Sequence, residues 1–210
     1  GNNKSCNTSK GDPATTSMPV TQEMIDAWKA DSVLGGTITG NHTFSSAGNF
    51  GPKKITGNLT INANMTITGT VYVQGNITVG NNVTVRLSSS YGSSGGVVMT
   101  DGRVILSNNV TFAGSGQSTS YLMLLTTSQC PTGCSGLNAI DLSNNVGAVI
   151  INAQNGTVHL SNNVNLNEVV AKTVQLDNNA TVTYITGLAD TNFSSGPGGG
   201  FDISSWKEIP

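Results

Sequence analysis

Apolar residues recur along this chain in pairs with one residue between them, and over long stretches each pair begins six residues after the last. Between residues 57 and 85 the pairs are Leu59/Ile61, Met65/Ile67, Val71/Val73, Ile77/Val79 and Val83/Val85. A spacing of two places both side chains of a pair on one face of an extended strand. Asn58 and Asn64 recur eighteen residues later as Asn76 and Asn82. Short strands that turn a corner every six residues and repeat every eighteen predict a three-sided parallel β-solenoid.

The same register continues through about six to seven coils, or roughly 30 Å of stacked strands at ~4.8 Å per strand. First-face pairs are Leu59/Ile61, Ile77/Val79, Val104/Leu106, Ile140/Leu142, Val158/Leu160 and Val174/Leu176. Second-face pairs are Met65/Ile67, Val83/Val85, Val110/Phe112, Val146/Ala148, Val164/Leu166 and Ala180/Val182. Third-face pairs are less regular: Val71/Val73, Val97/Met99, Leu122/Leu124, Ile151/Ala153 and Val169/Ala171. A weaker upstream coil is expected to contain His42, Phe44 and Ile55.

Asparagine recurs at the corner between the first and second faces. The repeated positions are Asn64, Asn82, Asn109, Asn145, Asn163 and Asn179. Asparagine tolerates the left-handed backbone of a tight corner, and its amide can bond to the coils above and below. A structural Asn ladder therefore explains why several of these residues also match the Asn-X-Ser/Thr pattern for N-glycosylation. Glycosylation stays open for Asn3, Asn7 and Asn192, which lie outside the coils.

The two ends of the solenoid are predicted to be covered, because exposed strand edges invite polymerisation. Residues 20–31 have the pattern of an amphipathic helix, with Thr21 as N-cap and Met24, Ile25 and Trp28 as its apolar stripe. We expect this helix to lie over the first coil, and residues 201–210 to fold back as a closing strand. The resulting division is an N-terminal tail (1–19), a capping helix (20–36), the solenoid (37–190) and a C-terminal loop with closing strand (191–210).

Composition favours a location outside the cell. Charged residues make up 10% of the chain, the formal net charge is −2, and Asn, Ser, Thr and Gly are abundant. This charge gives no electrostatic basis for binding nucleic acid or an anionic membrane surface, and no apolar run is long enough to span a bilayer. Of the three cysteines, Cys130 and Cys134 are candidates for a small disulfide loop, while the pairing of Cys6 stays open. A zinc site is the rival interpretation, but three cysteines without a nearby His make a poor ligand set.

Three insertions interrupt the period, and insertions in solenoids map to surface loops that often carry binding. Residues 86–96 and 113–120 follow the second face of successive coils, so we expect these two loops to lie side by side. Residues 126–136 leave from the next corner. Tyr91 is the one aromatic residue in these insertions and is a candidate ligand-binding residue. The alternative is that these insertions have no function and are tolerated, since surface insertions cost little stability.

Candidate chemistry is sparse, with seven charged residues between 56 and 187. The outward column of the first face places Asp141 and His159 on adjacent coils, ~4.8 Å apart. This acid–imidazole pair is a second candidate for ligand binding, with a surface ion pair as the alternative. No paired carboxylates can be placed across one groove as a glycosidase would need, so we predict neither catalytic residues nor a metal or cofactor. An outward Thr column would suit an ice-binding face, but Gly147 and Asn165 interrupt it.

Two resemblances to known families follow from these motifs. The rhythm of residues 57–85 is similar to that of bactofilins, whose three-sided right-handed β-helix polymerises end to end. Over most of the chain, the closer resemblance is to the Asn-rich ectodomains of type IV pilus-associated, minor-pilin-like surface proteins of Patescibacteria. It is carried by MPVTQEMIDAWKADSVLGG, GPKKITGNLTI, the repeated LSNNV and FSSGPGGGFDISSWKEIP. The resemblance implies a surface location, suggests attachment and supplies no catalytic residues.

The sequence thus predicts an all-β, right-handed parallel β-helix with an N-terminal helix, the handedness resting on the resemblance and on the general preference for right-handed crossovers. The expected function is a non-enzymatic extracellular adhesion or pilus-associated module that contacts a glycan or an envelope protein through the insertion loops. We expect the fragment to be monomeric. A carbohydrate-active enzyme or lectin-like binder, and a polymer-forming structural solenoid, are the alternatives.

Overall fold

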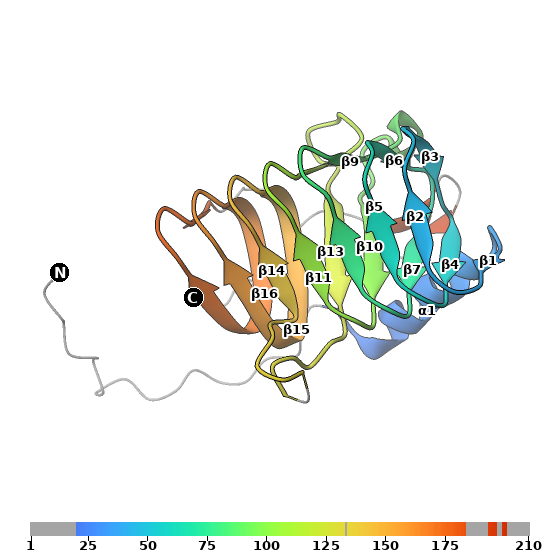
Figure 1. Cartoon of the computed structure of the whole chain (residues 1–210). Helices are drawn as coiled ribbons and strands as arrows, with labels where there is room; N and C mark the ends of the chain where they lie inside the picture. Colours follow the sequence, from blue (N-terminus) through green and yellow to red (C-terminus); the bar gives the residue numbers. More distant parts are fainter. Residues whose placement is uncertain (1–19, 133, 184–192, 197–198, 201–210) are drawn as a thin grey trace, which may run out of the picture.

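The computed structural model describes residues 20–132, 134–183, 193–196 and 199–200, and most of them belong to a single wound sheet of short strands (Figure 1). One α-helix, α1 (Gln22–Val33), precedes the sheet, and a 3-10 turn spans Ser89–Tyr91. The sheet strands are β1 Thr37–Ile38, β2 His42–Phe44, β3 Gly48–Phe50, β4 Lys53–Ile55, β5 Leu59–Ile61, β6 Met65–Ile67, β7 Val71–Val73, β8 Ile77–Val79, β9 Thr84–Leu87, β10 Gly96–Thr100, β11 Val104–Leu106, β12 Thr111–Ala113, β13 Leu122–Thr126, β14 Ile140–Leu142, β15 Gly147–Leu160, β16 Asn165–Leu176 and β17 Thr181–Val182. A separate antiparallel pair consists of β18 (Ser194–Gly196) and β19 (Gly199–Gly200).

The sheet winds into a three-sided parallel solenoid, as the sequence predicts. From β1 to β12, each strand pairs in parallel with the strand three places further along the chain, so β2, β5, β8, β11 and β14 stack on the first face. The long strands β15 and β16 continue the stack around a corner, since each contributes to more than one face. Every first-face pair predicted from the sequence stands in the predicted register, from Leu59↔Ile77 to Val158↔Val174.

The predicted register is wrong at three places; at one of them, Leu124 of β13 pairs with Ile151, where Leu122 was expected. On the second face Met65 pairs with Val85 instead of Val83, because five residues lie between Val79 and Val85, whereas three lie between their partners Ile61 and Met65. On the third face Val98 and Thr100 of β10 face the interior, where Val97 and Met99 were expected. All five residues of β10 are buried, so the strand lacks the polar–apolar alternation that would reveal its register.

Aliphatic side chains from all three faces fill the interior, and most are fully buried. The upstream coil predicted to contain His42, Phe44 and Ile55 is present, and Ile55 lies in the core. At the N-terminal end of the stack, Phe50 packs against two rings of the same coil, with ring centroids 5.5 Å away for His42 and 5.6 Å for Phe44. Aromatic rings of the first coil therefore cover the core at this end.

The predicted helix is present, and Thr21 is its N-cap, accepting a hydrogen bond from the Met24 backbone N–H. Its position differs from the expectation. Instead of covering the end of the stack, α1 lies along the outer side of the third face, against β4 of the first coil and β7 of the next (Figure 1). Trp28 and Ile25 pack there in a second apolar cluster with Met99, which points outward from β10. The outward apolar residues of the third face explain the position, because they need a cover.

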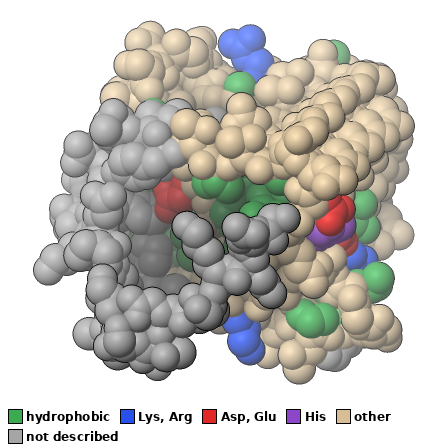
Figure 2. Space-filling view, turned by 90° about the vertical axis from the view of Figure 1, so that its left-hand side faces the viewer, with side chains coloured by type: hydrophobic (Ala, Val, Ile, Leu, Met, Phe, Trp, Pro, Cys, Tyr) green, Lys and Arg blue, Asp and Glu red, His purple; other side chains and the backbone are tan. Residues whose placement is uncertain are grey.

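The described C-terminal residues also lie against the side of the solenoid. Phe193 is fully buried in the outer cluster with Trp28, and β18 contacts both α1 and β10. The predicted closing strand, residues 201–210, lies outside the described residues. At the C-terminal end of the described solenoid, Leu176 is 60% exposed and Val182 is 47% exposed. Figure 2 looks onto this end and shows hydrophobic side chains in the middle of it.

Candidate functional site

The first two insertion loops lie side by side, as predicted from the corner they share. The Ser115 hydroxyl donates a hydrogen bond to the Gly92 carbonyl, and the Ser120 hydroxyl donates to the Ser94 carbonyl over 2.7 Å. These bonds join residues 86–96 of one coil to residues 113–120 of the next. Apart from Arg86, where the first loop begins, the outer side chains of the pair are hydroxyls and one amide, with Ser93, Gln117 and Thr119 exposed. The two loops thus form one polar surface that is fixed by side-chain to backbone bonds.

Tyr91 does not belong to that surface. The sequence suggests it as an exposed ligand-binding residue, but the structure buries it to 4% exposure in the main core. Its ring lies beside Gly96, where an added Cβ would approach the ring to 3.0 Å. Burial raises the pKa of the Tyr91 hydroxyl, which makes no hydrogen bond. Tyr91 anchors the first loop to the solenoid; it is unavailable to a ligand.

The Asn ladder is present at the corner between the first and second faces. Five of the six predicted residues adopt the left-handed backbone, with φ between 58° and 60°: Asn82, Asn109, Asn145, Asn163 and Asn179. The Nδ2 group of Asn109 donates to Oδ1 of Asn82, and that of Asn145 donates to Oδ1 of Asn109, each over 3.0 Å. Stacked amides therefore join successive coils at this corner.

Asn64 is the exception in the ladder. Its Oδ1 accepts a hydrogen bond from the Thr84 backbone N–H over 2.9 Å, and its φ is not positive. The reason is the shorter corner before β6, which places Asn64 beneath Thr84 instead of beneath Asn82. The asparagines one residue earlier in each corner form a neighbouring, regular column. In it Asn144 donates to Asn108, and Asn162 donates to Asn144, each over 3.2 Å.

A second Asn column, at the corner between the third and first faces, was not identified from the sequence. Oδ1 of Asn41, Asn58 and Asn76 each accepts a backbone N–H from the next coil over 2.8 Å. A glycine precedes each of these asparagines. A Cβ added to Gly57 would lie 2.4 Å from a backbone carbon of Gly40, so a side chain cannot fit there. The repeated Gly-Asn dipeptide was the available signal.

Charged residues gather on the first face, around the predicted Asp141–His159 pair. Asp141 and His159 are register partners on adjacent coils, with 3.4 Å between Oδ1 and Nδ1. The other ring nitrogen of His159, Nε2, lies 3.1 Å from Oδ2 of Asp177. Arg103 forms an ion pair with Asp141 from the other side. These four residues, the charged column, span four successive coils; Arg103 and Asp177 were missed because they occupy corners outside the regular outward column.

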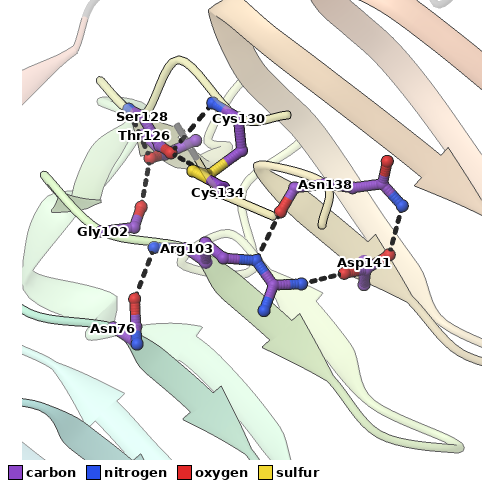
Figure 3. Close-up of a disulfide and its surroundings, with 9 residues drawn as sticks. All are labelled: Asn76, Gly102, Arg103, Thr126, Ser128, Cys130, Cys134, Asn138 and Asp141. Atoms are coloured by element: carbon purple, nitrogen blue, oxygen red, sulfur yellow. Dashed lines mark hydrogen bonds and ion pairs between the residues drawn. A yellow bond between two sulfur atoms is a disulfide. The ribbon is translucent and has the colours of Figure 1, made fainter. Parts of the chain in front are cut away.

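The third insertion stands beside the charged column and contains the predicted disulfide (Figure 3). Cys130 and Cys134 are bonded, with 5.2 Å between their Cα atoms, which rules out the zinc interpretation for this pair. Cys130 is buried, and the Ser128 hydroxyl lies 3.0 Å from its sulfur. Further along the loop, the Asn138 side chain donates to Asp141 over 2.8 Å. The loop therefore helps to position the charged column. Cys6 lies outside the described residues.

A second ionic group holds α1 to the third face. Nζ of Lys29 lies 2.6 Å from Oδ1 of Asp101, and this oxygen also accepts a hydrogen bond from the Thr127 hydroxyl, while Oδ2 accepts one from the Tyr72 hydroxyl. Burial by itself raises the pKa of Asp101, but the hydrogen bonds and the charge of Lys29 outweigh it and hold that pKa below its usual value. Burial and the bond to Asp101 raise the pKa of Tyr72. The group has a structural role, because each member is already paired.

Metal sites and membrane-spanning helices are both absent from the described ranges. No cluster of three or more His, Cys, Asp or Glu side chains there is placed to hold a metal ion. No helix in the same ranges has the length and apolar character to cross a bilayer.

Comparisons with known proteins give no match to this chain, whether with family models, with curated proteins or with solved structures. Its function must therefore be argued from the geometry of its own surfaces.

Proposed function

We propose that this protein is a non-enzymatic module displayed outside the cell, where it attaches to a glycan or an envelope protein through the two paired loops at one solenoid corner. One observation carries the proposal: residues 86–96 and 113–120 form a single surface fixed by hydrogen bonds between the loops. A surface that is ordered before binding loses less conformational entropy when a ligand arrives, so modest polar contacts suffice for recognition.

A binding role fits the loops better than tolerated length alone. Loops without a function need no mutual order, yet Ser115, Ser120 and the core anchor Tyr91 all restrain these two. Their exposed hydroxyl and amide groups can donate and accept hydrogen bonds, which suits a ligand rich in hydroxyls. The attachment site is therefore assigned to the exposed tips, where Gln117 and Thr119 lie.

The charged column supports the non-enzymatic assignment. Both oxygens of Asp141 are already partnered, by Arg103 and by Asn138, and both ring nitrogens of His159 face carboxylates. A general base needs a free position beside the proton that it removes. Partially exposed ion pairs of this kind contribute little energy individually and are common on protein surfaces. We assign the column a role in holding adjacent coils together.

Disulfide bonds persist in oxidising surroundings, so the Cys130–Cys134 bond supports an extracellular location. The proposed association with type IV pili rests on the sequence resemblance. It can be tested by immunogold labelling of the full-length protein on cells that carry pili; label confined to the cell body would contradict it.

The attachment site can be tested on a glycan array with matched variants. The triple substitution Gln117→Ala, Ser118→Ala and Thr119→Ala removes exposed polar groups from the second loop, and we expect it to abolish binding seen with the original protein. The control, Thr173→Ala with Gln175→Ala, removes exposed polar groups from β16 and should bind normally. Binding that survives the triple substitution would refute the loop site. Hydrolysis of chromogenic glycosides by the purified protein would refute the non-enzymatic assignment.

A further inference from the structure

Three parallel rows of uncharged polar side chains cover the corner and face next to the paired loops. We call this area the amide–hydroxyl surface. The first two rows are the asparagine columns, Asn81, Asn108, Asn144, Asn162 and Asn178 beside Asn82, Asn109, Asn145, Asn163 and Asn179, and all ten side chains are exposed. The third row is the outward column of the second face. Its members are register partners on successive coils: Thr84, Thr111, Gly147, Asn165 and Thr181.

The asparagine rows keep hydrogen-bonding capacity that the ladder does not use. A carboxamide has two N–H donors and two acceptor positions. We call each asparagine level of the ladder a rung. Asn144 donates to Asn108 and Asn162 donates to Asn144, so one hydrogen of each Nδ2 group is bonded to the rung of the preceding coil. The second hydrogen of each group is available to a ligand or to water. The ladder therefore offers a donor at each of these rungs, held in a fixed direction by the stacking.

The chemistry of this surface limits its partner. None of its rows contains a charged residue, and the exposed Arg86, two residues after Thr84 on the same side of β9, is one cation at its edge; one cation gives little affinity for a nucleic acid or an anionic polymer. Exposed large hydrophobic residues such as Leu137 and Leu176 lie elsewhere, and Val182, next to Thr181, is on the core side of β17, where it pairs with Leu166. Protein interfaces usually need a buried apolar or aromatic centre. An uncharged ligand rich in hydroxyl groups is the class that remains.

The spacing of the rows indicates an extended ligand. Rungs recur at the strand spacing of ~4.8 Å, so five rungs present equivalent groups along about 19 Å. A polymer with similar polar groups on every unit can meet several rungs at once, and the contacts then add through effective concentration. We propose that the amide–hydroxyl surface binds an extended, uncharged polysaccharide lying parallel to the solenoid axis. This inference rests on the proposed attachment function and names its ligand class.

Valine substitutions test the surface with little disturbance of the fold, because valine matches threonine in shape and suits strands. The test variant carries Thr84→Val, Thr111→Val and Thr181→Val. The control variant carries Thr43→Val, Thr60→Val and Thr78→Val, which form the equivalent outward column on the first face. Binding is measured by depletion on cellulose and chitin particles and by affinity electrophoresis in xyloglucan, mixed-linkage β-glucan and anionic polygalacturonate. Thermal unfolding by circular dichroism verifies that both variants fold.

We expect binding to at least one neutral polysaccharide, none to polygalacturonate, and a roughly tenfold loss in the test variant from the missing hydroxyl contacts. The control variant should bind normally. Equal losses in both variants, or no loss in the test variant, would overturn the inference. Binding that depends on Gln117 and Thr119 alone would also overturn the inference, because the ligand would then contact only the loop. The proposed function would still stand. If no neutral polysaccharide is bound, this inference is refuted, while attachment to an envelope protein through the paired loops still stands.

Discussion

The Asn ladder can be tested at Asn145, where the side chain has two separable roles. Its φ of 58° lies in the left-handed region, and its Nδ2 group donates to Asn109 over 3.0 Å. Alanine at this position loses the hydrogen bond, worth about 1 kcal/mol, and must hold a left-handed backbone, which costs about 1 kcal/mol more. Glycine loses the same bond but adopts the left-handed region freely. We expect Asn145→Ala to lower the free energy of unfolding by about 2 kcal/mol and Asn145→Gly by about 1 kcal/mol.

The neighbouring Asn144 provides a matched control. It also bonds along its column, to Asn108 and Asn162, but its φ is not positive. At Asn144 we therefore expect the reverse order, with glycine more destabilising than alanine, because glycine has more conformational entropy to lose. Urea unfolding of all four variants, followed by circular dichroism, gives the comparison. If Asn145→Gly were as harmful as Asn145→Ala, the ladder position would not depend on the left-handed backbone, and our reasoning about this corner would fail.

Three other perturbations give distinct expectations. Asp101→Asn should destabilise the protein by about 1 kcal/mol at pH 7 and loosen α1, seen as a change in tryptophan fluorescence. The pKa of Asp101 is lowered on folding, so the bond to Lys29 stabilises the fold fully at pH values above 3.8, the ordinary pKa of aspartate. This stabilisation is lost as the pH falls through the lower pKa of the folded state. The variant should therefore lose less stability in acid than the original protein. Replacing Cys130 and Cys134 with serine should cost about 2 kcal/mol, since the bond closes a short loop, and a melting temperature equal to that of the original protein would contradict a stabilising role. Tyr91→Phe removes a buried hydroxyl without a hydrogen bond and should leave stability unchanged within about 0.5 kcal/mol or raise it; a clear loss in urea unfolding would show that the hydroxyl has a partner.

Local repetition made most of the solenoid predictable. Where one side of a strand faces the core and the other faces water, as at Leu59–Ile61, the alternation fixes the register, and stacking repeats it in every coil. The left-handed corners could be predicted for the same reason, because few residues other than asparagine and glycine tolerate that backbone. The side-by-side placement of the two loops followed once their corners were assigned.

Prediction failed where a residue's environment came from distant parts of the chain. Strand β10 is apolar on both sides because α1 and Phe193 cover its outer surface, so its sequence has no alternation to interpret. Tyr91 sits in a loop of serines and glycines, yet its ring enters the core beside Gly96. Its type was compatible with either position, and only the path of the folded loop decided between them.

The sequence by itself determined the winding, the faces and the asparagine corners, because each depends on residues within one coil and its immediate copies. The tertiary structure decided which side α1 covers, which loop residues remain exposed, and that Arg103 and Asp177 join the predicted Asp141–His159 pair on one face. Those outcomes depend on contacts between residues far apart in the chain. The period of the sequence contains no information about such contacts, because packing and burial select them only after the coils have formed.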